Sequence, residues 1–102
     1  MAKRTVVWTE TAAWQRREIL KYWTKRNGSV KYAEKLIQLT SKQLKVILNH
    51  PESFKFSEYP DTRESAMGYF SIYYKITLEH IIITAFWDNR QNPKNLLELL
   101  EK

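Results

Sequence analysis

The hydrophobic pattern of this chain changes from a helical period to a strand period near Thr62, and no other feature constrains the fold as strongly. Over residues 30–49, apolar residues recur every three or four positions, as on one face of a helix. Beyond Thr62 they alternate with other residues, as in a half-buried strand. Helices followed by a run of strands are typical of α+β domains, in which the helices cover one face of the sheet. We expect one domain spanning residues 1–102, since this length supports a single hydrophobic core.

A short strand and a helix are predicted at the start of the chain. Residues 4–8, RTVVW, are rich in β-branched and aromatic side chains, which is typical of a strand. Thr9 or Thr11 offers a cap for the helix, and Asn27-Gly28 ends it because both residue types tolerate positive φ. One face of this helix is expected to turn inward with Ala12, Ile19, Tyr22 and Trp23.

The next helix carries the clearest period in the chain. It is predicted over residues 30–49, with Ser29 as its candidate cap and Pro51 closing it. Because the link between the two helices is so short, they must form an antiparallel hairpin. The expected inward face of the second helix consists of Ala33, Ile37, Thr40, Leu44, Ile47 and Leu48.

Three strands and a final helix are predicted after a loop over residues 51–62. TRESAM before Gly68 is the first strand, and the turn TLEH joins the other two in an antiparallel hairpin. Asn92-Pro93 is a typical helix start for KNLLELLEK. The predicted order is β-α-α-β-β-β-α, with a helical hairpin on a small, mostly antiparallel sheet whose other face is open. The helix-facing side of the last two strands is expected to hold Phe70, Ile72, Tyr74 and Ile76, then Ile81, Ile83, Ala85 and Trp87.

The charge and composition limit the classes of partner that the protein is expected to have. The net charge is +6, which suggests a polyanionic partner, either nucleic acid or an acidic protein segment. The basic, aromatic exterior of the first helix, QRRE and KYWTKR, fits nucleic acid or a solvated face equally. Cysteine is absent and no apolar run is long enough to span a bilayer, so we expect a cytoplasmic protein without a membrane partner.

Several classes of chemistry are excluded by what the sequence lacks. A catalytic triad needs a histidine, and the two histidines, His50 and His80, fall at a helix end and in a strand turn. Two glycines cannot make a Gly-rich phosphate loop, and no metal-ligand spacing is present. We therefore expect no metal and no cofactor.

The polar cluster DNRQNP, between the last strand and the final helix, is the first candidate site. Arg90 lies next to the N-terminus of that helix, whose free N–H groups attract anions, and its planar guanidinium suits phosphate or carboxylate. Lys94 is expected to add charge there. The alternative is that Arg90 packs over Trp87 and satisfies loop carbonyls.

Arg63 is the second candidate, at the start of the strand that precedes Gly68. Arg63 and Arg90 are expected to converge at one edge of the sheet. Glu58, in the preceding loop, is then placed to act as a base. Tyr73, on the strand face opposite Tyr74, is the exposed candidate for stacking on a nucleobase.

Taken together, these segments resemble the RelE/ParE superfamily of toxins from bacterial type II toxin–antitoxin systems. The resemblance lies in VVWTETAAWQRREILKYW, in TRESAMGYFSIYYKI, and in IIITAFWDNRQNPKNL, which is similar to the arginine-bearing tail of plasmid-stabilisation proteins. It implies a helical hairpin against a twisted sheet, and an acidic antitoxin that wraps and neutralises the basic toxin.

The resemblance leaves two activities open. RelE-like members cleave mRNA on the ribosome without a metal, whereas ParE-like members inhibit DNA gyrase and need no catalytic residues. Ser71 stands where RelE-like sequences carry an arginine, and no tyrosine follows Tyr74. The ribonuclease set thus reduces to Arg63, Arg90, Glu58 and Lys94 without a general acid. We therefore expect a ParE-like gyrase inhibitor. The alternatives are a ribosome-dependent endoribonuclease and a non-toxic, basic nucleic-acid-binding module.

Overall fold

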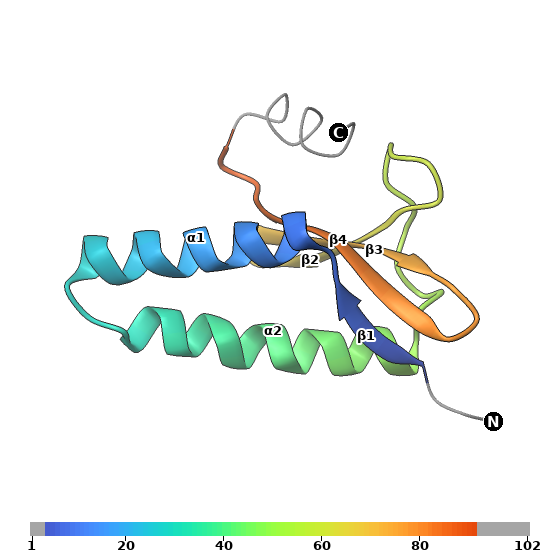
Figure 1. Ribbon diagram of the computed structural model, residues 1–102, viewed down its shortest axis with the longest axis horizontal. Coiled ribbons are helices and arrows are strands. Elements are labelled where there is room, and N and C mark those ends of the chain that lie inside the picture. Colours follow the sequence, from blue (N-terminus) through green and yellow to red (C-terminus); the bar gives the residue numbers. More distant parts are fainter. Residues whose placement is uncertain (1–3, 92–102) are drawn as a thin grey trace.

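The computed structural model describes residues 4–91, in which two helices pack on one face of a four-stranded sheet (Figure 1). The expected α+β fold is confirmed. The final helix expected after Asn92-Pro93 lies outside the described residues. The elements are β1 (Thr5–Trp8), α1 (Glu10–Asn27), α2 (Lys31–Asn49), β2 (Arg63–Met67), β3 (Phe70–Ile76) and β4 (His80–Asp88).

The sheet is mixed, with strand order β1-β4-β3-β2. β2, β3 and β4 form an antiparallel meander, as expected. β1 pairs in parallel with β4, where Val6 lies opposite Ile81. The helical hairpin carries the chain from β1 to the far side of the sheet, so β4, the last strand, lies between β1 and β3.

Both ends of α1 follow the signals in the sequence. The Thr9 side-chain oxygen accepts a hydrogen bond from the backbone N–H of Ala12 at 3.1 Å, which caps the start. Gly28 ends the helix in the left-handed region, with φ 62°. In α2, by contrast, the capping position is Val30, while the Ser29 hydroxyl accepts from the N–H of Lys31. Neither helix in this part of the chain has the length and hydropathy that crossing a bilayer requires.

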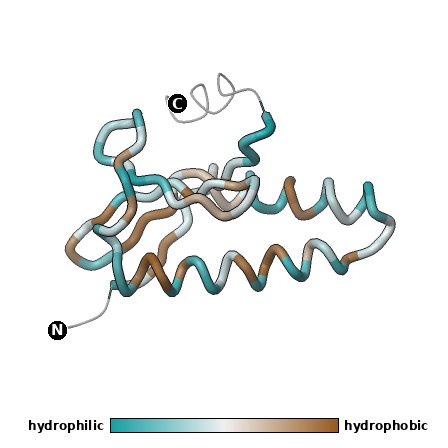
Figure 2. The backbone as a smooth tube through the Cα atoms, turned by 180° about the vertical axis from the view of Figure 1, so that it is seen from behind, coloured by the Kyte–Doolittle hydropathy of each residue, from teal (hydrophilic) through white to brown (hydrophobic). Residues whose placement is uncertain are grey.

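The inward faces of the helices differ from the expected ones at four positions, two on each helix. Tyr22 is 54% exposed, and the buried residue on that side of α1 is Gln15. On α2 the buried residue is Leu36 rather than its neighbour Ile37, which is 40% exposed. Ala33, Thr40 and Ile47 are buried as expected. Figure 2 shows hydrophobic residues recurring along α2 and gathering in the strands.

A β-bulge at the middle of β4 changes which of its residues face the helices. Tyr74 lies opposite Ile83 and Tyr73 opposite Ala85, so Thr84 is the extra residue. Before the bulge, Ile83 packs in the core under the helices; after it, Phe86 does. The expectation that Ala85 and Trp87 share that face is therefore wrong, because an unbroken alternation cannot register an inserted residue.

The face of the sheet opposite the helices is less open than the sequence suggested. Tyr73, Ala85 and Trp87 form a second buried cluster there, and Tyr59 from the loop after α2 packs against it. The rings of Tyr59 and Tyr73 meet edge to face, with centroids 5.8 Å apart. The loop that precedes β2 therefore folds back over this face.

Candidate functional site

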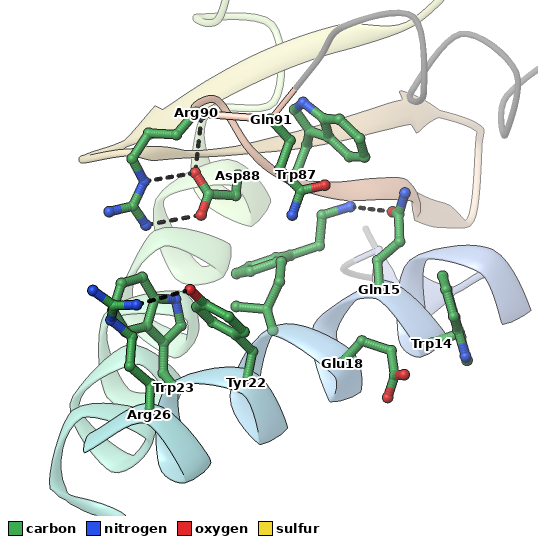
Figure 3. A pocket seen from close by; sticks show the side chains of 12 residues that line it. Trp14, Gln15, Glu18, Tyr22, Trp23, Arg26, Trp87, Asp88, Arg90 and Gln91 are labelled. Atoms are coloured by element: carbon green, nitrogen blue, oxygen red, sulfur yellow. Dashed lines mark hydrogen bonds and ion pairs between the residues drawn. The ribbon is translucent and has the colours of Figure 1, made fainter.

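Arg90, the leading candidate in the sequence, is held by the residue that ends β4. Its Nε and Nη2 donate to the two carboxylate oxygens of Asp88 at 2.9 and 2.8 Å, and its backbone N–H donates to Oδ1 at 2.9 Å (Figure 3). Such a bidentate pair fixes the plane of the guanidinium. The side chain of Asp88 is nearly buried and that of Arg90 is partly exposed.

The ionisation of Asp88 depends on this arginine. Burial alone would raise the pKa of the carboxyl, but the side-chain and backbone hydrogen bonds from Arg90, together with its charge, lower the pKa below its usual value. The carboxylate therefore stays ionised at neutral pH. It forms an ion pair with Arg90, whose side chain remains 41% exposed to solvent.

The guanidinium of Arg90 also lies on aromatic rings, although not on Trp87 as the sequence alternative had it. Its central carbon is 5.0 Å from the ring centre of Trp23 and 4.6 Å from that of Tyr69. Trp23 belongs to α1 and Tyr69 to the turn between β2 and β3, so Arg90 joins the end of the sheet to the helical hairpin. Arg26, one turn along α1, lies 5.9 Å from the same indole.

A groove of about 780 Å³ lies beside this contact, between α1 and the end of β4. Five of its twelve lining residues are aromatic, and two arginines stand at one end (Figure 3). The α1 residues that line it are Trp14, Gln15, Glu18, Ile19, Tyr22, Trp23 and Arg26, and those from the end of the sheet are Phe86, Trp87, Asp88, Arg90 and Gln91.

Gln15 is a second polar residue, besides Asp88, that is buried in the wall of this groove. Its carboxamide oxygen accepts the backbone N–H of Phe86 at 2.9 Å, which ties α1 to β4. Because that partner is a donor, the atom facing it must be the oxygen, and the other atom is the NH₂ group. This Nε2 is buried and has no hydrogen-bond partner.

Arg63 and Arg90 do not converge. Arg63 lies opposite Tyr74 in the β2–β3 pairing, whereas Arg90 follows Asp88, which lies opposite Phe70. The two arginines therefore flank opposite ends of β3, which rises about 3.4 Å per residue. The antiparallel meander brings the start of β2 to the end of β3, and this register was not readable from the sequence.

The surroundings of Arg63 assign it a structural role. Its Nη1 donates to the carbonyls of Glu52 and Phe54, at 3.3 and 2.6 Å, and its guanidinium lies 4.0 Å from the ring centre of the exposed Phe56. Arg63 thus fastens the loop after α2 to the first residue of β2. The nearby Tyr74 hydroxyl is also used, since it donates to the Pro51 carbonyl at 2.7 Å.

A polar network crosses the sheet on the face opposite the helices; it consists of Glu64, Ser71, Tyr73 and Asn89. The Glu64 carboxylate accepts from the Ser71 hydroxyl at 3.0 Å and from the Tyr73 hydroxyl at 3.3 Å. Asn89 donates its side-chain amide to Ser71 at 2.9 Å. We call this set the sheet-face network. It spans β2, β3 and the residue after β4, and Ser71 is fully buried within it.

The expectation of an exposed, stacking Tyr73 is wrong, because its side chain is only 7% exposed. Tyr59 covers its ring, and its hydroxyl is engaged by Glu64. Burial and then the Glu64 carboxylate raise the pKa of the Tyr73 hydroxyl well above its usual value, so it remains protonated at neutral pH. Glu58, the proposed base, is exposed on the loop, and Lys94 lies outside the described residues.

Sequence reasoning missed Glu64 and Gln15. Glu64 alternates with inward residues on β2, which signals an outward position, but its partners come from another strand and only the register identifies them. Gln15 sits among apolar positions of α1, and a lone amide in such a stripe is a signal that was available. Within residues 4–91, no group of three histidine, aspartate or glutamate side chains is placed to hold a metal ion.

The fold and these contacts define the chain as an α+β protein with a helical hairpin over a mixed sheet and an aromatic, arginine-lined groove between them. No protein-family model matches the sequence. No curated protein matches it either. Among solved structures, a chain of the chromosomal ParDE toxin–antitoxin system from P. aeruginosa shares the fold, with a TM-score of 0.71. The two sequences are 22% identical, and the match covers 82% of this chain and 94% of that one.

Proposed function

We propose that this protein is the toxin of a type II toxin–antitoxin pair, a ParE-like growth inhibitor that acts on DNA gyrase and is neutralised by an antitoxin. The shared fold with a chain of a ParDE system supports the class. The sequence segments that resemble RelE/ParE toxins map onto β1 and α1, onto β2 and β3, and onto β4 with the residues after it.

The sheet-face network is the observation that favours gyrase over mRNA. Metal-independent RNA cleavage needs a group that takes a proton, a group that gives one, and cations for the phosphate. Here the carboxylate of Glu64 is tied to two hydroxyls, and the pKa of Tyr73 is raised, which makes it a poor proton donor. Arg63 and Arg90 are each bound elsewhere and lie apart. This arrangement suits a folded, non-catalytic surface.

The charge distribution supports an acidic antitoxin as the partner. Residues 10–49, which form the helical hairpin, contain nine Lys and Arg and three Glu, a net charge of +6. The whole chain also carries +6, so the hairpin accounts for all of it. A partner with an acidic segment is therefore drawn to the hairpin rather than to the sheet. Arg90, at the junction of the two, is our candidate contact residue.

A supercoiling assay tests the proposed target. Purified DNA gyrase, relaxed plasmid and ATP are incubated with increasing amounts of the protein, and we expect supercoiling to fall as the protein reaches the gyrase concentration. The heat-denatured protein is the control for non-specific binding of a basic chain to DNA. Unchanged supercoiling at a large molar excess would contradict the gyrase assignment.

A cell-free translation reaction with mapping of mRNA 5′ ends separates the two activities. A gyrase inhibitor leaves the mRNA intact, with or without ribosomes. Ribosome-dependent cuts would instead identify a RelE-like endoribonuclease, and Glu64, Arg63 and Arg90 would then be the residues to substitute first.

A further inference from the structure

The groove between α1 and the end of β4 is wide enough for a side chain or a turn of a partner, since ligand sites span roughly 300 to 1,000 Å³. Two of its lining residues are large and exposed: Trp14 is 48% exposed, and Tyr22 is exposed as well. Buried tryptophan and tyrosine contribute most strongly to protein interfaces, because they remove much apolar area with few rotors to order. Two such rings at the rim of one groove suit a protein partner.

Of the charged side chains that line the groove, Arg26 is the one without an ion-pair partner among residues 4–91. Glu18 is paired with Lys21 at 3.3 Å, and Asp88 is paired with Arg90 at 2.8 Å. Arg26 lines the same groove and has no acidic partner among residues 4–91; its Nη1 lies 3.4 Å from the Tyr22 hydroxyl, and its guanidinium stacks near Trp23. A carboxylate brought by a partner would complete this end of the groove.

Gln15 adds a directional requirement. The residue is 5% exposed, and its Nε2 group lacks an acceptor although Oε1 is bonded to β4. A buried donor without a partner is energetically unfavourable, and a bound acceptor removes that penalty. Because Nε2 is buried, side chains at the rim of the groove must move before an acceptor can reach it.

We propose that this groove binds an acidic segment of the antitoxin, with an apolar side chain among the exposed rings, a carboxylate on Arg26 and an acceptor on Gln15 Nε2. The proposal rests on the proposed function, which supplies the antitoxin as the partner. It makes Gln15 and Arg26 the residues that decide which antitoxin is recognised: a hydrophobic groove alone accepts many apolar segments, whereas a buried donor rejects those that lack an acceptor.

The test compares charge-reversing substitutions of two neighbouring residues at the end of α1, Arg26 and Lys25. Arg26→Glu reverses a charge inside the groove, and Lys25→Glu reverses an exposed charge that does not line it. The probe is the full-length product of the reading frame next to this gene, titrated calorimetrically into each variant. We expect Arg26→Glu to weaken binding by on the order of tenfold or more. Lys25→Glu should change it by less than about threefold.

Gln15→Glu probes the hydrogen bond separately. The substitution keeps an oxygen for the Phe86 N–H and replaces the NH₂ donor with a second acceptor, so binding should weaken while circular dichroism stays that of the wild type. Equal effects of Arg26→Glu and Lys25→Glu on binding would show that only the overall charge matters, which would overturn the proposal that the groove binds the antitoxin. Wild-type affinity in both Arg26→Glu and Gln15→Glu would do the same.

A growth assay distinguishes failure of the groove proposal from failure of the proposed toxin function. The Arg26→Glu protein should still arrest growth, and an amount of the neighbouring product that rescues wild-type cells should fail to rescue it. Rescue equal to that of wild type would overturn the groove and leave the toxin assignment standing. A wild-type protein that neither arrests growth nor binds the neighbouring product would contradict both.

Discussion

At the scale of single residues, the site is built by side chains that satisfy one another. The sequence singled out Arg90 as a candidate functional residue, and the structure shows its contacts: it pairs with Asp88 and lies over Trp23. The partners were not predictable. An arginine two residues after an aspartate is common, and only the packing of α1 against the end of β4 brings the indole under the guanidinium.

The Asp88–Arg90 pair should make stability fall in acid. The native pKa of Asp88 lies below its unfolded value of about 3.9, so the pair stabilises the protein above pH 4 and the stabilisation is lost as pH falls through the native pKa. Asp88→Asn should cost about 1 to 2 kcal/mol at pH 7 and clearly less at pH 3. Urea unfolding at both pH values measures this.

Asp61→Asn is the matched control, since Asp61 is exposed in a loop and asparagine accepts its positive φ of 54°. This substitution should leave the unfolding midpoint nearly unchanged at either pH. A gap between wild type and Asp88→Asn that is the same at pH 7 and pH 3 would show that ionisation of Asp88 does not stabilise the fold.

At the scale of elements, local signals predicted both ends of α1 but not the residues against which it packs. Thr9 and Gly28 bound α1 because capping and left-handed backbone are local properties of one residue. The bulge at Thr84 escaped prediction because the alternation of β4 continues through it in the sequence. Missing the bulge also hides a contact of the groove. The bulge turns Phe86 toward the helices, and the backbone N–H of Phe86 is the group that Gln15 binds.

Gly28 offers a clean test of the link between the helices. A Cβ at this position would meet nothing within 4 Å, so Gly28→Ala changes only the cost of the left-handed backbone. We expect a loss of about 1 kcal/mol in the free energy of unfolding, read from urea titrations at constant m-value. Gly28→Asn should lose less, because asparagine visits this region more readily. Equal losses in the two variants would point to another cause.

At the scale of the whole molecule, the order of elements follows from the switch in hydrophobic period, while the register of the strands does not. Helix, helix and meander were each readable, and α+β packing follows once their apolar faces must be covered. The pairing of β1 with β4 and the opposite positions of Arg63 and Arg90 depend on contacts far apart in the chain. Sites that are formed by such long-range contacts can be identified only once the structure is known.

At the same scale, charge and hydrogen-bonding groups are distributed unevenly over the two faces of the molecule. Its net charge lies on the helical hairpin, and the groove opens along α1, which belongs to that hairpin. The sheet-face network lies on the opposite face of the sheet and is satisfied internally. The two faces therefore differ in charge and in the hydrogen-bonding groups that they leave available.

The most direct measurement is the growth of a bacterial culture after induction of this protein, with and without co-expression of the product of the adjacent reading frame. We expect growth to stop within a few generations when the protein is made alone, and to continue when both are made. Undiminished growth with the intact protein present by immunoblot, in the absence of the neighbouring product, would contradict the assignment as a toxin.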